Sequence, residues 1–271
     1  MSTQLPLILS PTELAQQIDN PNLLIIDLSK KENHDKAHIA GAIHFDYAHI
    51  IRSIKPIMGL LPDINELNRV LSMVGINDTM TIVAYDDEGG GKAARLLWTL
   101  DLLKHPASSL LDGGMFSWVN EGHPTSHEPT IPVPTESHYT LHEEGIASQD
   151  YIVNHLNDSN VKFLDSRSPE EFAGSKVFAN HGGHIPGAIN MDWMLTIDKS
   201  NNMRLLNDDK LKDLLESKGL NKNQQIIVYC QTHHRSSHTY VVLKHLGYTN
   251  LMGYPGAWSD WGNSETTPKE V

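Results

Sequence analysis

Residues 225–237 read Gln-Ile-Ile-Val-Tyr-Cys-Gln-Thr-His-His-Arg-Ser-Ser, and the interpretation of the whole chain starts from them. The first part is a short apolar, β-branched run, which predicts a buried strand that stops at Cys230. A polar loop follows, and residues 238–247 then predict a helix that ends at a glycine. A strand, a tight loop and a helix N-terminus form a place that binds anions, because backbone N–H groups and the positive end of the helix dipole converge there.

Cys230 is the only cysteine in the chain. A cysteine at such a loop can have its pKa lowered from about 8.5 into the range ~3.5–7.5, and the thiolate is the nucleophilic form. Arg235 and the two histidines of the loop favour the thiolate as well. The competing interpretation is a small core residue at the end of a strand, a place where cysteine is common. The cationic loop favours a reactive thiolate.

The composition is that of a globular protein, with 271 residues, 39% hydrophobic and 20% charged, which is enough for two domains. The formal net charge of -12 argues against generic binding of nucleic acid or acidic membranes, since both favour a basic surface. No window approaches the ~20 apolar residues of a membrane span. Residues 1–9 lack the basic start and long apolar stretch of a signal peptide. A single cysteine forms no intrachain disulfide, so we expect a cytoplasmic protein.

The chain repeats itself. Residues 66–86 contain a predicted helix, a glycine and a predicted strand, and residues 210–230 repeat that order at an offset of 144 positions. The motif His-Ile-Ala-Gly-Ala-Ile at residues 38–43 returns as His-Ile-Pro-Gly-Ala-Ile at residues 184–189. A third match joins residues 111–118 to residues 251–258. The period is too long for a solenoid and indicates two copies of one domain.

Each copy alternates short apolar runs with helical patterns. This predicts an α/β domain in which helices cover both faces of a parallel sheet. Between the copies, residues 123–134 contain four prolines, which disfavour a helix and predict an extended linker. We therefore expect a first domain over residues 1–124, a linker over 125–145 and a second domain over 146–271. Sites in such sheets form at the carboxyl ends of strands, where Cys230 lies.

The paired His-Ile-x-Gly-Ala-Ile motifs, residues 165–172 and the strand-cysteine-loop unit resemble the rhodanese superfamily over essentially the whole chain. The arrangement is similar to that of the tandem-domain thiosulfate sulfurtransferases, whose C-terminal domain is catalytic and whose N-terminal copy has lost its cysteine. Asp86 stands at that lost position here. The loop over residues 230–235 resembles the bacterial type. It departs from the loop rich in glycine and valine of mercaptopyruvate-specific enzymes and from the Arg-Lys that follows the cysteine of vertebrate thiosulfate enzymes.

The resemblance implies a sulfurtransferase that works through a persulfide on Cys230. The thiolate attacks the outer sulfur of a donor such as thiosulfate, sulfite leaves, and a thiol, cyanide or a sulfur-accepting protein then takes the sulfur. We expect no cofactor and no metal. Thiosulfate is a dianion, so its site needs cations and N–H donors. The candidate substrate-binding residues are Arg235, Arg167, Gln231, Thr232, His233 and His234, with Trp193 as a wall of the pocket by resemblance.

Several of these residues also have a structural interpretation. Arg167 could pair with a nearby carboxylate (Asp165, Glu170 or Glu171), and His233 and His234 could be exposed loop residues without a role. We expect Asp27 and Asp165 to cap the turns that follow them. His38 and His184 are expected to be packing residues.

Other functional classes are weaker. A protein phosphatase would place its arginine six positions after the cysteine, where Ser236 stands. A metal site made by Cys230, His233, His234 and His238 lacks paired-ligand spacing. A 3-mercaptopyruvate sulfurtransferase and a non-catalytic sulfur-carrier or regulatory module stay open as alternatives. The loop that starts at Asp86 lacks the lysine of a phosphate-binding loop and is interpreted as the degenerate active loop of the first copy. Because Asp86 stands at the position that matches Cys230, Asp86→Ala is expected to leave turnover near wild type, with at most a modest change in stability.

Overall fold

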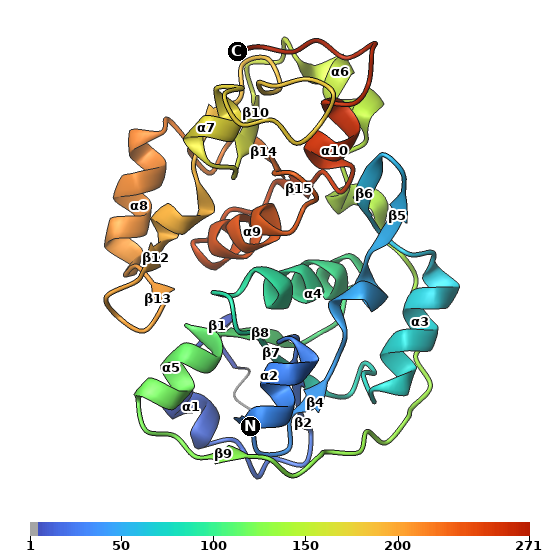
Figure 1. Ribbon diagram of the computed structural model, residues 1–271, viewed down its shortest axis with the longest axis vertical. Coiled ribbons are helices and arrows are strands. Elements are labelled where there is room, and N and C mark those ends of the chain that lie inside the picture. Colours follow the sequence, from blue (N-terminus) through green and yellow to red (C-terminus); the bar gives the residue numbers. More distant parts are fainter. Residues whose placement is uncertain (1–4) are drawn as a thin grey trace. The chain divides into compact units, whose positions relative to one another are not determined.

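The structure is a computed structural model that describes residues 5–271 (Figure 1). Residues 1–4, the start of the stretch considered above for a signal peptide, lie outside the described residues. The chain divides into two compact units, and each is built from discontinuous segments. Unit 1 comprises Met1–Ile50, Pro62–His142 and Ile197–Leu205, and unit 2 comprises Ile51–Leu61, Glu143–Thr196 and Leu206–Val271.

Unit 1 contains a five-stranded parallel sheet in the order β1-β8-β7-β2-β4. Its strands are β1 (Ile8–Leu9), β2 (Leu23–Asp27), β4 (Ile43–His44), β7 (Thr81–Tyr85) and β8 (Ser108–Leu111). Its helices are α1 (Pro11–Ala15), α2 (Lys31–Lys36), α3 (Ile64–Met73), α4 (Gly91–Leu102) and α5 (Gly114–Asn120), with the 3-10 turn η1 (Tyr47–Ile50). Two antiparallel pairs complete it, β3 (His38–Ile39) with β9 (Thr125–Ser126) and β12 (Ile197–Asp198) with β13 (Arg204–Leu205).

The apolar residues of the unit 1 strands are buried on both faces of the sheet, as the near-continuous apolar runs predict. Ile25 and Val83 pack with Leu14 of α1 and Trp118 of α5 on one face. Helix α4 contacts β7 and β8 and buries nearly all of its side chains.

Unit 2 contains a four-stranded parallel sheet in the order β11-β10-β14-β15. Its strands are β10 (Val161–Asp165), β11 (Ile189–Asn190), β14 (Gln225–Tyr229) and β15 (Leu251–Gly253), with the antiparallel hairpin β5 (Arg52–Ile54) and β6 (Ile57–Leu60). Its helices are α6 (Gln149–His155), α7 (Pro169–Phe172), α8 (Asp208–Ser217), α9 (Arg235–His245) and α10 (Ala257–Trp261), with the 3-10 turns η2 (Glu143–Gly145) and η3 (Trp193–Thr196).

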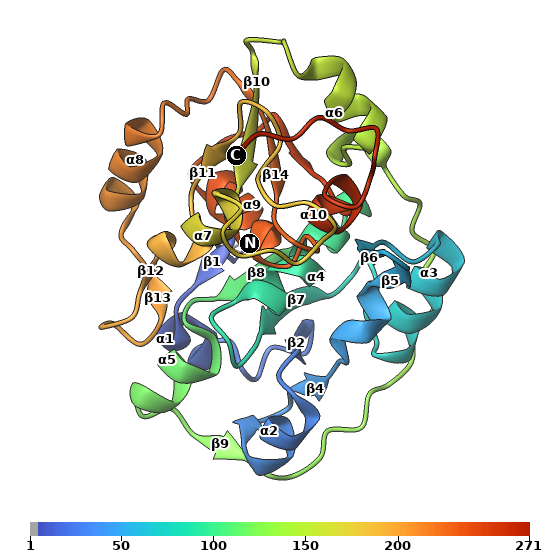
Figure 2. The ribbon, with the colours of Figure 1, turned by 45° about the horizontal axis from the view of Figure 1, so that its top comes forward.

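The central strands of unit 2 carry the Cys230 loop at their carboxyl ends. Strands β10 and β14 pair from Val161 to Asp165 and from Gln225 to Tyr229, and Figure 2 shows them side by side. Ile227 and Tyr229 pack with Trp258 and Trp261 of α10 on one face. Helix α9 contacts β14 and β15. The fold class predicted from the sequence, two similar α/β units with parallel sheets flanked by helices, is confirmed.

The repeat is also visible in a reciprocal exchange of hairpins. The hairpin β5–β6 comes from the first half of the chain but belongs to unit 2, and β12–β13 comes from the second half but belongs to unit 1. The two hairpins start at Arg52 and Ile197, 145 positions apart, close to the repeat offset. In unit 2 the backbone N–H of Met58 donates to Ser259 Oγ of α10 at 3.0 Å. In unit 1 the N–H of Leu205 donates to Asp112 Oδ1, just before α5, at 2.7 Å.

The turn caps follow the sequence, and the linker range stays a prediction. The described linker residues form β9 and otherwise no regular element before η2. Asp27 and Asp165 cap the turns that follow them, as predicted, by accepting the N–H of Ser29 at 2.8 Å and of Arg167 at 3.0 Å. His38 is buried and its ring nitrogens contact two backbone carbonyls. Among residues 5–271, no helix is long and apolar enough to cross a bilayer.

Candidate active site

The loop at Cys230 is short and its helix begins early. Strand β14 ends at Tyr229, and α9 begins at Arg235, three residues before the predicted start at residue 238. His233 turns the chain with φ of 56°, a left-handed conformation that side chains rarely adopt. Ser237 Oγ donates to the His233 carbonyl at 2.5 Å, and Ser237 N donates to the His234 carbonyl at 3.2 Å. These local bonds close the loop tightly around the cysteine.

The side chain of Cys230 is 1% exposed, and its sulfur is surrounded by donors. Burial raises the pKa of the thiol, but the charge of Arg235, the hydroxyl and N–H of Ser236 and the N–H of Thr232 together lower it below its usual value. The thiolate is therefore stabilised by a guanidinium and by backbone N–H groups at the start of α9. The expected strand-loop-helix anion site is present around the sulfur.

Arg235 is held in place by a carboxylate that the sequence did not single out. Its two terminal nitrogens donate to the two carboxylate oxygens of Glu171 at 2.6 and 2.8 Å, in a bidentate ion pair. Burial raises the pKa of Glu171, but the hydrogen bonds and charge of Arg235, the N–H of Ser168 and the charge of Arg167 together lower it below the usual range. Glu171 is also the third residue of α7 in a capping box that starts at Ser168.

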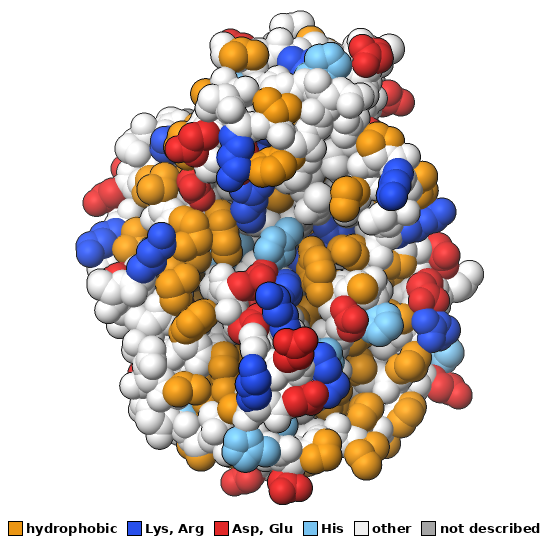
Figure 3. All heavy atoms as spheres, in the orientation of Figure 1, with side chains coloured by type: hydrophobic (Ala, Val, Ile, Leu, Met, Phe, Trp, Pro, Cys, Tyr) orange, Lys and Arg blue, Asp and Glu red, His pale blue; other side chains and the backbone are white. Residues whose placement is uncertain are grey.

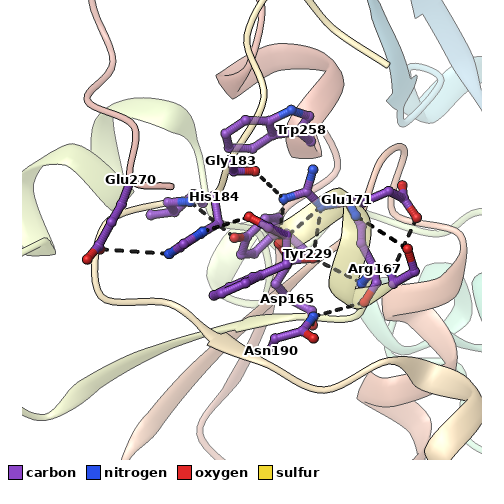
Figure 4. Close-up of polar contacts among 12 residues, drawn as sticks. Asp165, Arg167, Glu171, Gly183, His184, Asn190, Tyr229, Trp258 and Glu270 are labelled. Carbon is purple, nitrogen blue, oxygen red and sulfur yellow. Dashed lines mark hydrogen bonds and ion pairs between the residues drawn. The ribbon is translucent and has the colours of Figure 1, made fainter. Parts of the chain in front are cut away.

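Arg167 lies in a buried network beside the site, and Figure 4 shows its guanidinium between Asp165 and the Gly183 carbonyl. Its Nη2 donates to Asp165 at 2.6 Å and to Gly183 O at 2.8 Å, and the Trp258 ring centroid is 4.4 Å from the guanidinium carbon. The side chain is 2% exposed. Of the two roles open to Arg167 from sequence, the structure therefore realises the ion pair with Asp165. The guanidinium binds these partners, and its role toward the substrate stays a prediction.

The two loop histidines occupy different environments. His233 is fully buried, and its Nδ1 lies 2.8 Å from the Oγ of Ser236, the residue that also donates to the cysteine sulfur. It is thus not the exposed loop residue of the alternative interpretation. His234 is partly exposed, and its ring lies 6.2 Å from that of Trp193. Trp193 also meets the buried His238 ring edge-on at 5.2 Å, and burial lowers the pKa of His238 to about 3.

Gln231 and Thr232 connect the loop to its surroundings. The amide of Gln231 donates to the Phe178 carbonyl at 3.2 Å, and the Gln231 carbonyl accepts the N–H of Ser259 at 3.0 Å. The Thr232 carbonyl lies against Gly59 of the hairpin β5–β6, where a Cβ would come within 2.3 Å of that oxygen. Residues from the first half of the chain therefore support the catalytic loop.

The matching loop of unit 1 holds the carboxyl group of Asp86, whose pKa is raised by burial although backbone N–H groups lower it. Asp86 is completely buried, and its Oδ1 accepts the N–H groups of Glu88 and Gly90 at 3.0 and 2.8 Å. Its Oδ2 accepts the N–H groups of Lys92 and Ala93 at 2.9 and 3.0 Å. Glu88 and Lys92 precede Thr232 and Ser236 by 144 positions, so the same two loop positions donate to the carboxylate in unit 1 and to the sulfur in unit 2.

Three contributors to the site were missed by sequence reasoning. They are Glu171, Ser236 and Gly59. The sequence indicated Glu171 only as a possible partner of Arg167 and did not connect it with Arg235, which is 64 positions away. Ser236 stands directly after the predicted cation, and no pattern near Gly59 points to the loop. Within the part of the chain that the structure describes, no group of three or more His, Cys, Asp or Glu side chains could hold a metal ion.

Sequence comparison matches both copies. The model of the Rhodanese-like domain family matches residues 10–121 and 148–264. The chain is 38% identical to the thiosulfate sulfurtransferase of Pseudomonas aeruginosa over 269 residues, 99% of this chain and 98% of that protein. It is 37% identical to the thiosulfate sulfurtransferase of Azotobacter vinelandii, covering 98% of each. It is 29% identical to the sulfur carrier protein TtuD of Thermus thermophilus, covering 97% of this chain and 96% of that one.

Solved structures share the fold. A structure of EanB matches 98% of this chain and 70% of its own chain with a TM-score of 0.87 and 20% identity. The crystal structure of YnjE matches 98% of this chain and 68% of its own with a TM-score of 0.85 and 19% identity. At these identities the likeness concerns the fold alone.

Proposed function

Because the chain belongs to the rhodanese-like domain family and is a sulfurtransferase, we propose that it transfers the outer sulfur of thiosulfate to a thiol or to cyanide through a persulfide on Cys230. The observation that carries the proposal is the environment of Cys230. A buried sulfur with a lowered pKa meets Arg235 and the N–H groups of Thr232 and Ser236. Such a site favours both a thiolate nucleophile and an anionic product on that sulfur.

In the first step, the Cys230 thiolate attacks the outer sulfur of thiosulfate. A new S–S bond forms, the S–S bond within thiosulfate breaks, and its electron pair leaves with sulfite. The enzyme keeps a persulfide whose terminal sulfur carries the negative charge that the thiolate had. Arg235 supports this step, since its guanidinium attracts the donor dianion and also lies against Cys230.

The persulfide needs donors for its outer sulfur, and the loop of unit 1 indicates which positions supply them. There the two carboxylate oxygens of Asp86 accept four hydrogen bonds. The donors are the N–H groups of Glu88, Gly90, Lys92 and Ala93. The repeat equivalents in unit 2 are Thr232, His234, Ser236 and Ser237. The N–H of Ser237 donates to the His234 carbonyl, so we assign the N–H groups of Thr232, His234 and Ser236 to the stabilisation of the persulfide, in the manner of an oxyanion hole.

In the second step, an acceptor attacks the terminal sulfur. The bond between the two persulfide sulfurs breaks, its electron pair returns to Cys230, and the thiolate is restored. Cyanide leaves as thiocyanate and a thiolate leaves as its own persulfide, so no further oxidant or reductant is consumed. The name of the TtuD relative, a sulfur carrier protein, supports a protein as a further acceptor class.

We assign the substrate pocket to Arg235, Thr232, His234 and the wall formed by Trp193. We assign to Gln231 and His233 the role of holding the loop, and to Arg167 a place in the buried network with Asp165 and Gly183. The first copy is assigned no chemistry, since Asp86 replaces the cysteine and fills its loop. A lone cysteine that acts as a thiolate is kept reduced in the cytoplasm, where we place the enzyme.

The reaction class is tested by intact-mass spectrometry. Thiosulfate should add the mass of one sulfur atom to the wild-type protein, and cyanide should remove it. Cys230→Ser should neither gain the sulfur nor form thiocyanate, while its circular dichroism and thermal transition stay those of a folded protein. Thiocyanate production by the serine variant would overturn the persulfide mechanism.

The donor is tested by a side-by-side assay. The loop carries Arg235, two histidines and no glycine, which favours a compact dianion over a bulkier carboxylate donor. We expect a higher kcat/KM for thiosulfate than for 3-mercaptopyruvate with cyanide as the acceptor. The reverse order would assign the enzyme to the mercaptopyruvate class.

A further inference from the structure

Two segments of unit 2 flank the catalytic loop directly after the cysteine. In the hairpin β5–β6, Gly59 packs against the Thr232 carbonyl so closely that a Cβ would lie 2.3 Å from its oxygen. In the insert over residues 173–183, the Phe178 carbonyl accepts the Gln231 side chain at 3.2 Å. Gln231 and Thr232 follow Cys230 by one and two positions. Both segments therefore contact residues adjacent to the cysteine in the loop.

Both segments expose apolar side chains. Ile54 is 50% exposed, Phe178 is 57% exposed and Val177 is 48% exposed. Ile54 pairs with Ile57 across the hairpin, and alternation along β6 puts Ile57 on the face that Gly59 turns to the loop. Single exposed apolar residues are ordinary, but these belong to segments that contact two consecutive residues of one loop.

The same two segments are cationic. Residues 51–61 contain Arg52 and Lys55 and no acidic residue, and residues 173–183 contain Lys176 and no acidic residue. Lys176 Nζ lies 5.2 Å from the centroid of the Phe178 ring. One acidic group lies close to this segment: the exposed Glu170, whose pKa is lowered by a hydrogen bond from Ser168 and also by the charge of Lys176. Figure 3 shows basic and hydrophobic side chains side by side where Figure 1 labels β5 and β6. These segments are therefore locally positive, although the whole chain has a formal net charge of -12.

The burial of the Cys230 sulfur limits which acceptor proteins can take a sulfur atom from it. Cys230 is 1% exposed, so a flat protein surface cannot bring its own thiol to the persulfide. A thiol on an extended or protruding segment can enter, while residues on either side of that thiol meet the flanking segments.

We propose that Arg52, Ile54, Lys55, Lys176, Val177 and Phe178, called the acceptor rim, dock an acidic protein that offers its acceptor thiol on an extended segment with apolar side chains. The proposal rests on the persulfide chemistry proposed above. The acceptor thiolate attacks the outer persulfide sulfur, the bond to Cys230 breaks, and Cys230 leaves as the thiolate. Complementary charge speeds the encounter, and apolar contact holds the segment.

The test uses two short unstructured peptides as probes. Each has one cysteine between leucines, flanked by aspartates in the first peptide and by lysines in the second. The enzyme is loaded with thiosulfate, freed of excess donor and mixed with each peptide, and sulfur transfer is followed by mass. We expect the acidic peptide to react about tenfold faster at low salt, with the ratio approaching one at ~1 M salt, where screening reaches about 3 Å.

Matched variants locate the effect on the rim. Lys55→Glu should remove most of the preference for the acidic peptide, whereas Lys199→Glu, an exposed lysine 144 positions later in the equivalent hairpin of unit 1, should keep it. Phe178→Ala should slow transfer to both peptides, whereas Phe116→Ala, which removes a 43% exposed phenylalanine of unit 1, should not. Each rate of sulfur transfer to a peptide is divided by the rate at which cyanide removes the sulfur from the same enzyme preparation.

The outcomes separate the two proposals. Failure to gain sulfur from thiosulfate, or to lose it to cyanide, would contradict the proposed function itself. Normal loading and discharge with equal rates for the two peptides would overturn the acceptor rim. Equal effects of Lys55→Glu and Lys199→Glu would overturn it as well.

Discussion

The guanidinium of Arg235 donates to both carboxylate oxygens of Glu171, at 2.6 and 2.8 Å, and the same guanidinium lies against the sulfur of Cys230. The cation of the active loop is therefore positioned by a carboxylate from α7. Glu171 orients the positive charge and at the same time partly neutralises it. The balance between these two effects sets how strongly the thiolate is stabilised.

Removal of the cation should weaken donor capture. For Arg235→Ala we expect kcat/KM for thiosulfate to fall roughly ten- to a hundred-fold, because a charge-assisted hydrogen bond contributes ~1.5–3 kcal/mol. The pKa of Cys230 is held down by Arg235, so the thiolate exists above that lowered pKa and is lost as the pH falls through it. The variant should shift the pH profile of iodoacetamide alkylation to higher pH. Arg204→Ala, which breaks a similarly exposed pair with Glu121, is the control and should leave both readouts unchanged.

Removal of the counter-charge should shift the same profile the opposite way. Glu171→Gln keeps the size of the side chain and deletes one negative charge near the thiolate. We expect the Cys230 alkylation profile to move to lower pH, by up to about one unit. A shift to higher pH would mean that Glu171 acts mainly by positioning Arg235, so that loss of alignment outweighs the gain in net positive charge.

Arg167 should prove to be a stabilising residue. In Arg167→Lys, the ammonium cannot reproduce the fork that joins Asp165 to the Gly183 carbonyl, and the thermal transition should fall by the equivalent of about 1–3 kcal/mol. The KM for thiosulfate should stay within about twofold of wild type, since Asp165 and the Gly183 carbonyl already bind the guanidinium. Arg69→Lys, which alters a fully exposed bidentate pair with Glu66, should change neither quantity. A large rise in KM without loss of stability would restore Arg167 to the substrate site.

Asp86 should matter for stability more than the sequence indicates. Its carboxylate satisfies four buried N–H groups, so Asp86→Ala should destabilise unit 1 by about 3 kcal/mol or more rather than modestly. Asp86→Asn should not rescue it, because an amide nitrogen would face two donors. Hydrogen exchange over residues 86–93 and urea unfolding measure the effect, and Asp63→Ala at the exposed N-cap of α3 should cost only about 1 kcal/mol. Turnover per folded molecule should stay near wild type.

A larger residue at Gly59 of the hairpin should slow the reaction at Cys230. In Gly59→Ala the new methyl group would lie 2.3 Å from the Thr232 carbonyl oxygen and 2.6 Å from that of Pro255, and both are backbone atoms that must shift. Because misplacement of a catalytic group by about 1 Å can slow a reaction a hundredfold, single-turnover persulfide formation should slow at least about tenfold. Ser53→Ala on the same hairpin is the control. Persulfide formation at the wild-type rate in Gly59→Ala would show that the hairpin yields without disturbing the loop.

Much of the fold was predictable because its signals are local. The apolar runs that became β7 and β14, the helices α3 and α8 and the turn caps at Asp27 and Asp165 all follow from residues adjacent in sequence. The start of α9 was predicted three residues late. The helix starts earlier because Ser237 donates a hydrogen bond to the His233 carbonyl and His233 adopts a left-handed conformation, which together close the loop. The predicted start relied on the spacing of apolar residues, and that spacing carries no information about such polar contacts.

The sequence by itself identified the candidate nucleophile Cys230, the repeat and the aspartate at the matching position of the first copy, because each follows from residue identity at a constant offset. Only the tertiary structure decided which arginine lies against Cys230. It pairs Arg235 with Glu171 beside Cys230 and encloses Arg167 with Asp165. It also decided that Gly59, from the other half of the chain, supports the loop. The physical reason is that a hydrogen bond depends on where two side chains meet in space, and a linear pattern does not specify partners that are 64 or more positions apart.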